Sequence, residues 1–133
     1  MNSSGSGSAD VLVTVPARAE FMQLLRSAVG SIAARLDFTY ETIDDLRIAV
    51  DEACARILSV PGEPTSLTLR ITPMQDRIEV LASTDGKAED WPPEDFEESL
   101  TAKILDALVD EVSFERVGRS PAVRVVKRAT FNT

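Results

Sequence analysis

Apolar residues along the chain follow two spacings, one typical of strands and one typical of helices. The β-branched run at 11–15 predicts an opening strand. From about 16 to 36, and again from about 40 to 60, apolar residues recur at three- and four-residue steps, which predicts two amphipathic helices. Pro16 suits the first turn of the first helix, where its missing N–H costs nothing, and Thr39 suits the N-cap of the second.

The second half of the chain predicts four more strands and one more helix. Alternating apolar and polar residues at 66–72 and 77–83 predict two strands joined by a hairpin-sized connection. A third helix is expected at about 98–110, followed by an antiparallel pair at 111–117 and 122–128. The element order is therefore β-α-α-β-β-α-β-β. Three helices on one face of a mixed, mostly antiparallel sheet would give an α+β fold, a two-layer α/β sandwich.

The length of the chain, 133 residues, suits one hydrophobic core. We expect a single domain at 10–133, preceded by a flexible N-terminal lead at 1–9 that is rich in serine and glycine. The lead has neither the basic start nor the apolar stretch of a signal peptide. No apolar run approaches the roughly 20 residues that cross a bilayer. We therefore expect a cytoplasmic protein that does not bind a membrane.

Acidic residues outnumber basic ones and the two kinds are unevenly placed. The formal net charge is −8, from 22 Asp and Glu against 14 Lys and Arg. Such a chain should be repelled by nucleic acid and attracted to a basic protein surface, although acidity also serves solubility alone. Acidic residues dominate the segment 84–98, and basic residues dominate 115–128.

Histidine is absent, which excludes Ser-His-Asp hydrolases, Cys-His hydrolases and His-containing zinc sites. We accordingly predict no metal site built from such ligands. Cys54 is the single cysteine, so no intrachain disulfide can form. Its place on the apolar stripe of the second helix predicts a small buried residue rather than a redox sensor.

A resemblance to a known family lies at 43–55, in the segment IDDLRIAVDEACA. This segment resembles the first nucleotide motif, the N box, of the GHKL (Bergerat-type) ATPase domain in the RsbW and SpoIIAB anti-sigma factors. A second stretch at 104–112, ILDALVDEV, is similar to the helix and strand that follow the glycine-rich lid of that family. The resemblance runs from about 10 to 127 and implies a GHKL fold. It also implies a role in transcription regulation and stress response.

The N box of this family presents a Glu and, four residues later, an Asn on the helix face that meets the nucleotide phosphates. The Glu acts as a general base or water organiser, and the Asn holds Mg²⁺. Glu52 occupies the Glu position here, and Arg56 occupies the Asn position. A guanidinium has no acceptor atom and cannot ligate Mg²⁺, although it can pair with phosphate. Alternatively, Glu52 and Arg56 form an ordinary i,i+4 surface ion pair.

The remaining nucleotide motifs of the family are altered in this chain. Direct alignment places Ser83 where the family has an adenine-binding Asp, and Asp85 could substitute only if the loop shifts. The lid of the family carries Gly-x-Gly, whose backbone N–H groups wrap the phosphates, whereas Ser99 and Thr101 stand at these positions. ATP and Mg²⁺ remain possible cofactors from the resemblance, but these departures disfavour a kinase. The candidate cofactor-binding residues are Glu52, Arg56, Asp85 and Gly86.

Partner binding in this family involves an arginine on the first helix. Counting back from Glu52 without gaps places Arg26 at that position, off the apolar stripe, so we expect it to be exposed. The resemblance implies an anti-sigma factor that sequesters a sigma factor and is released by a STAS-type anti-anti-sigma factor in a partner switch. It also implies a homodimer formed through the sheets, for which the strand at 11–15 is a candidate.

Two alternatives remain open at this point. In the first, the chain is an active ATP-dependent serine kinase that phosphorylates its antagonist, with Glu52 as the catalytic residue. In the second, the fold alone matches, and the chain is an acidic scaffold or a ligand sensor. An arginine at position 56 and the missing glycines weigh against the first alternative.

Overall fold

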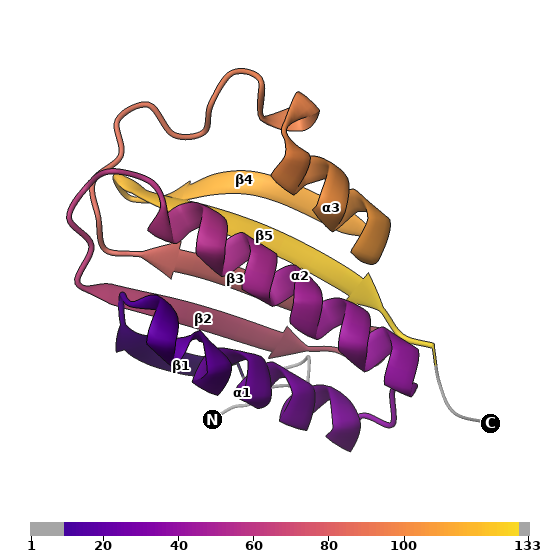
Figure 1. Cartoon of the computed structure of the whole chain (residues 1–133). Helices are drawn as coiled ribbons and strands as arrows, with labels where there is room; N and C mark the ends of the chain where they lie inside the picture. The colour runs from indigo at the N-terminus through magenta and orange to yellow at the C-terminus, as the bar shows by residue number, and fades with distance from the viewer. Residues whose placement is uncertain (1–9, 131–133) are drawn as a thin grey trace.

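The computed structural model describes residues 10–130 (Figure 1). Within this range the elements are β1 (Val11–Pro16), α1 (Met22–Arg35), α2 (Tyr40–Leu58), β2 (Ser66–Pro73), β3 (Arg77–Thr84), α3 (Leu100–Leu108), β4 (Glu111–Val117) and β5 (Ser120–Arg128). Short 3-10 helices at Ala19–Phe21 and Phe96–Glu98 precede α1 and α3. The predicted order of elements is confirmed. The predicted lead at 1–9 lies outside the described residues, so its flexibility stays a prediction.

The five strands form one sheet in the order β1-β2-β3-β5-β4. Each neighbouring pair is antiparallel, so no parallel pair occurs within residues 10–130. The three helices lie over one face of this sheet, with α2 between α1 and α3 (Figure 1). The expected α+β fold, a two-layer sandwich with helices on one face, is confirmed. β1 and β4 are the two edge strands.

The hydrophobic core lies between the helices and the sheet. Alternate residues of β2 and β3 point toward the helices and are at most 1% exposed, namely Leu67, Leu69, Ile71, Ile78, Val80 and Ala82. Leu46, Val50 and Ile57 on α2 pack onto them from above. Burying each such aliphatic side chain contributes about 1.5–3 kcal/mol. No helix within 10–130 is long and apolar enough to cross a membrane.

The first helix begins later than the sequence pattern predicts. Pro16 does not start it, because Pro16 is the last residue of β1 and pairs with Ser66. The next residue continues along β2, since the Ala17 N–H donates to the Thr65 carbonyl at 3.1 Å. The helix starts at Met22, next to Phe21, where the apolar stripe itself begins. Pairing with a distant strand thus overrides the local preference of proline.

Hydroxyl side chains cap the other two helices. Thr39 caps α2 as predicted, with its Oγ1 accepting from the Thr42 N–H at 3.3 Å. Ser99 caps α3, with its Oγ accepting from the Ala102 N–H at 3.1 Å. Such caps satisfy backbone donors that the first turn of a helix leaves free. The helix expected at about 98–110 is therefore shorter, because it starts after the Ser99 cap.

Candidate functional site

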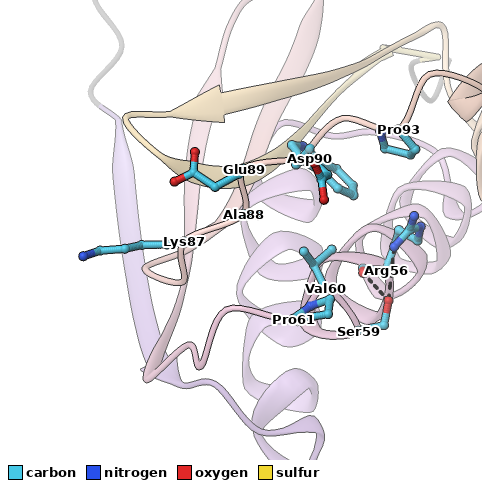
Figure 2. Close-up of a pocket in the computed structure, with 10 residues that line it drawn as sticks. Arg56, Ser59, Val60, Pro61, Lys87, Ala88, Glu89, Asp90 and Pro93 are labelled. Carbon is cyan, nitrogen blue, oxygen red and sulfur yellow. Dashed lines mark hydrogen bonds between the residues drawn. The ribbon is translucent and has the colours of Figure 1, made fainter.

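A cavity of about 390 Å³ opens between the C-terminal end of α2 and the loop that follows β3 (Figure 2). Two segments that lie far apart in the sequence supply its walls. The lining residues are Arg56, Ser59, Val60, Pro61, Lys87, Ala88, Glu89, Asp90, Trp91 and Pro93. Of the candidate cofactor-binding residues, Arg56 lines this cavity and Gly86 immediately precedes its second wall, so this cavity is the candidate site.

Two glycines bring the walls of the cavity together. The backbone of Gly62, with a φ of 152°, adopts a conformation that favours glycine. A Cβ at Gly62 would lie only 2.5 Å from the Lys87 carbonyl oxygen, and the Lys87 N–H donates to the Gly62 carbonyl at 3.3 Å. A Cβ at Gly86 would lie 3.1 Å from the Gly62 carbonyl oxygen. Gly86 therefore permits this close backbone approach.

Trp91 forms the inner wall of the cavity, and the sequence analysis did not single it out. Its side chain comes from the acidic loop, yet the residue is only 5% exposed. The indole stacks on Phe114 of β4, with centroids 5.1 Å apart and planes 5° apart. Its N–H donates to the Glu115 carbonyl at 2.8 Å. One feature of the sequence could have indicated this position: Trp91 is the single tryptophan and stands in a polar segment. So large an apolar ring is seldom left in water, which predicts that it is buried.

Arg56 packs against Trp91 and does not pair with Glu52. The guanidinium carbon of Arg56 lies 5.1 Å from the centre of the Trp91 ring, within cation–π range. One of its N–H groups donates to the Ser59 hydroxyl at 3.2 Å. Glu52 instead accepts from the Thr101 hydroxyl at 2.9 Å. The alternative of a Glu52–Arg56 surface ion pair is wrong, because α3 and the loop offer each side chain another partner.

Asp85 points away from the cavity and holds the start of β2. Its carboxylate accepts from the Thr65 N–H at 2.7 Å, from the Ser66 N–H at 3.0 Å and from the Thr65 hydroxyl. These bonds, first the hydroxyl and then the Ser66 amide, lower the pKa of Asp85 from 3.8 to about 2. Asp85 is absent from the cavity lining.

The strand before Asp85 shows which side chain faces the helices. Thr84 is buried, in line with the inward residues Ile78, Val80 and Ala82 of β3. Ser83 is half-buried and belongs to the opposite face. The Thr84 hydroxyl accepts from the Gly86 N–H at 3.2 Å. Thr84, rather than Ser83, therefore stands on the helix-covered face at the end of β3.

The residues at the lid positions have structural contacts of their own. Ser99 caps α3, and Thr101 is 9% exposed and donates to Glu52. Within residues 10–130 no group of three or more His, Cys, Asp or Glu side chains is arranged to hold a metal ion. With Arg56 donating only, and Glu52 already bonded to α3, the residues present do not fit a bound Mg²⁺ and triphosphate.

Arg26 lies on α1, on the side that faces α2. One guanidinium N–H donates to the Asp51 carboxylate at 2.6 Å, and another donates to the Gln23 side-chain oxygen at 2.9 Å. The side chain is 38% exposed, so part of the guanidinium faces solvent. Asp51 immediately precedes Glu52, and the pair therefore ties Arg26 to the helix that carries the N-box-like segment.

Comparison with known proteins identifies the family. A profile of the histidine kinase-like ATPase domain matches residues 15–127. The chain belongs to this family. A serine-protein kinase RsbW of Halalkalibacterium halodurans is 37% identical over 89 residues, which cover 66% of this chain and 54% of that protein. An anti-sigma-F factor RsbW of Mycobacterium tuberculosis is 34% identical over 113 residues, which cover 85% of this chain and 66% of that protein.

These relatives show that the chain is an RsbW-like member of the GHKL family, as the N-box-like segment predicts. The chain spans between about half and two thirds of the length of the two relatives. A crystal structure of the RsbU and RsbW domains of a Mycobacterium tuberculosis protein matches the fold with a TM-score of 0.67. That match covers 94% of this chain and 35% of the solved chain at 13% identity, so it supports the fold alone. The expected GHKL architecture is confirmed.

Proposed function

We propose that this RsbW-like chain is an anti-sigma factor that binds and sequesters an RNA polymerase sigma factor. A STAS-type anti-anti-sigma factor releases the sigma factor in a partner switch. Relatives named as an anti-sigma factor and as a serine-protein kinase support this family of roles. One property distinguishes the two roles, because a kinase needs Mg·ATP and a binding module does not.

The packing of Arg56 on Trp91 is the observation that favours a binding role over a kinase. In the family this position on α2 supplies an oxygen ligand for Mg²⁺, and a guanidinium cannot supply one. The Arg56 side chain is also engaged by Trp91 and Ser59 rather than free to meet a phosphate. Glu52, the residue a kinase would use as a base, is bonded to Thr101 of α3. The cavity therefore favours protein binding over phosphoryl transfer.

The remaining surfaces fit partner proteins. Arg26 is paired with Asp51 and is 38% exposed, so a carboxylate of a partner would meet its solvent-facing side or compete with Asp51 for it. The net charge of −8 favours basic segments of a sigma factor. A homodimer through the sheets would use β1, which is an edge strand with Leu12 61% exposed. We place this partner switch in the cytoplasm, where RNA polymerase is.

The test is a binding titration with purified sigma factors of the source organism. Arg26→Ala should weaken capture of the cognate sigma factor at least tenfold, because a guanidinium–carboxylate contact at an interface is lost. Arg35→Ala is the matched control, since Arg35 is exposed on the same helix. An unchanged affinity of Arg26→Ala, or an equal loss in both variants, would count against Arg26 as the contact.

The kinase remains a second candidate because Glu52 is retained. It predicts a heat of binding and a thermal shift with millimolar Mg·ATP, and transfer of phosphate to the antagonist. Glu52→Gln should then abolish transfer while the fold is kept. If neither heat nor shift is observed, the kinase is excluded. A protein that captures no sigma factor at all would instead support the acidic scaffold or ligand sensor.

A further inference from the structure

Trp91 occupies the space between α2 and the β4–β5 strands although it belongs to a loop. Besides Phe114, its ring contacts the guanidinium of Arg56, 5.1 Å from the ring centre. Phe96 stacks on the same Phe114, with centroids 4.7 Å apart. The ring is thus one member of a three-ring cluster, and of the three it is the one that lines the cavity.

The polar edge of the indole is satisfied inside the protein. Its single donor, the Nε1–H, is directed at the Glu115 carbonyl at 2.8 Å and lies 3.3 Å from the Ala122 carbonyl. A buried indole N–H without an acceptor would destabilise the folded state. Stacking, burial and hydrogen bonding therefore all favour the same inward orientation of the ring.

The backbone on both sides of Trp91 is tied to the end of the sheet. Arg116 of β4 donates to the Ala88 carbonyl at 2.9 Å, to the Trp91 carbonyl and to the Arg119 carbonyl at 3.2 Å. The Ala88 N–H donates to the Arg119 carbonyl at 3.0 Å, and the Arg119 side chain pairs with Glu89. These contacts hold the loop against β4 and β5.

We infer that the Trp91 ring, which forms a wall of this cavity, fills the adjoining space between α2 and the β4–β5 strands and determines specificity by excluding a nucleotide from that space. The indole takes the aromatic position between α2 and the sheet, and Arg116 holds the loop that carries it. This inference concerns the cavity and holds whichever protein the chain binds.

The fluorescence of Trp91 tests the inference in the unmodified protein, because Trp91 is the only tryptophan. Acrylamide should quench the native protein several-fold less than the urea-unfolded chain. Millimolar Mg·ATP should change neither the emission maximum nor the quenching. Strong quenching in the native protein would place the ring outside the cavity. A saturable red shift with Mg·ATP would show that nucleotide displaces the ring. Either result would overturn the inference.

A cavity variant tests the same site with indole as the probe. Trp91→Gly should lower Tm by several degrees, and millimolar indole should restore part of that loss without changing the wild type. Leu105→Ala is the control, because Leu105 is 0% exposed on α3 and lies outside the cavity lining. Indole should not rescue this control. Rescue of neither variant, or equal rescue of both, contradicts the assignment. The fluorescence test stands even where Trp91→Gly does not fold.

Discussion

The guanidinium of Arg56 lies over the ring of Trp91, 5.1 Å from its centre, and joins α2 to the loop that follows β3. In the GHKL family this position of the helix serves the nucleotide and its metal. Here the same position serves an internal aromatic side chain. The arginine that stands where the family has a metal-binding residue therefore has an aromatic partner for its charge within the protein.

Replacing Arg56 with Met keeps the aliphatic stem and removes the charge. The variant should lose about 0.5–1 kcal/mol of unfolding free energy, because the cation–π contact with Trp91 is lost. Urea unfolding followed by circular dichroism measures the loss. Arg35→Met, on the exposed face of α1, is the control and should stay within about 0.5 kcal/mol of wild type. Equal stabilities of both variants would show that the contact with Trp91 contributes nothing.

Replacing Gly62 with Ala should destabilise the protein more than replacing Gly118. Gly62 has a φ of 152°, and a Cβ there would lie 2.5 Å from the Lys87 carbonyl oxygen. Backbone strain and overpacking together should cost about 2–5 kcal/mol. Gly118 also has a positive φ, 62°, but a Cβ there meets nothing within 4 Å. Gly118→Ala should therefore cost only about 1–2 kcal/mol. Equal losses in thermal or urea unfolding would contradict the close approach of the two loops.

The hydrogen bonds of Asp85 predict a pH dependence of stability. The pKa of Asp85 is lowered from 3.8 to about 2, so the folded state binds its proton less tightly than the unfolded chain. Its contribution is fully present above the unfolded pKa and is lost as the pH falls through about 2. Asp85→Asn should be less stable than wild type at neutral pH, and the difference should shrink below about pH 4. Urea curves at several pH values measure this difference, and carboxyl NMR measures the pKa directly. A difference that grows on acidification would have the wrong sign.

The thiol of Cys54 should be unreactive in the folded protein. Cys54 is 1% exposed, and burial, followed by the charge of Asp51, raises its pKa to about 12. At pH 8 its reaction with Ellman's reagent should be at least about a thousandfold slower than in the unfolded chain, because the thiolate is the nucleophile. Stopped-flow absorbance in buffer and in urea gives both rates. Rapid reaction of the native protein would contradict the buried position.

Local pattern predicted most of the fold. The alternating pattern of β2 and β3 and the apolar stripe of α2 predict residues that the structure buries. Thr39 caps α2, as the sequence predicts. The start of α1 was missed because Pro16 satisfies two local rules, helix start and strand end. Only its pairing with Ser66, a residue far along the chain, decides between them.

The candidate site was harder to predict because its contacts join distant segments. The N-box spacing identified Glu52 and Arg56, but their partners Thr101 and Trp91 come from later parts of the chain. No periodicity marks the direction of a side chain in an irregular loop, so the orientation of Trp91 could not be derived. Direct alignment pointed to Ser83, whereas Thr84 is the side chain on the helix-covered face. A shift of one residue is enough to cause this error, because successive side chains of a strand point to opposite faces.

The central claim is that the chain captures its sigma factor by binding and without nucleotide. Calorimetric titration of the cognate sigma factor into the chain, with and without millimolar Mg·ATP, tests it most directly. The account predicts a complex whose Kd is the same within about twofold in both conditions, because Arg56 and Glu52 do not fit a bound Mg·ATP. A complex that forms only with Mg·ATP would contradict the exclusion of nucleotide, and the absence of a complex with any sigma factor of the source organism would contradict the proposed function.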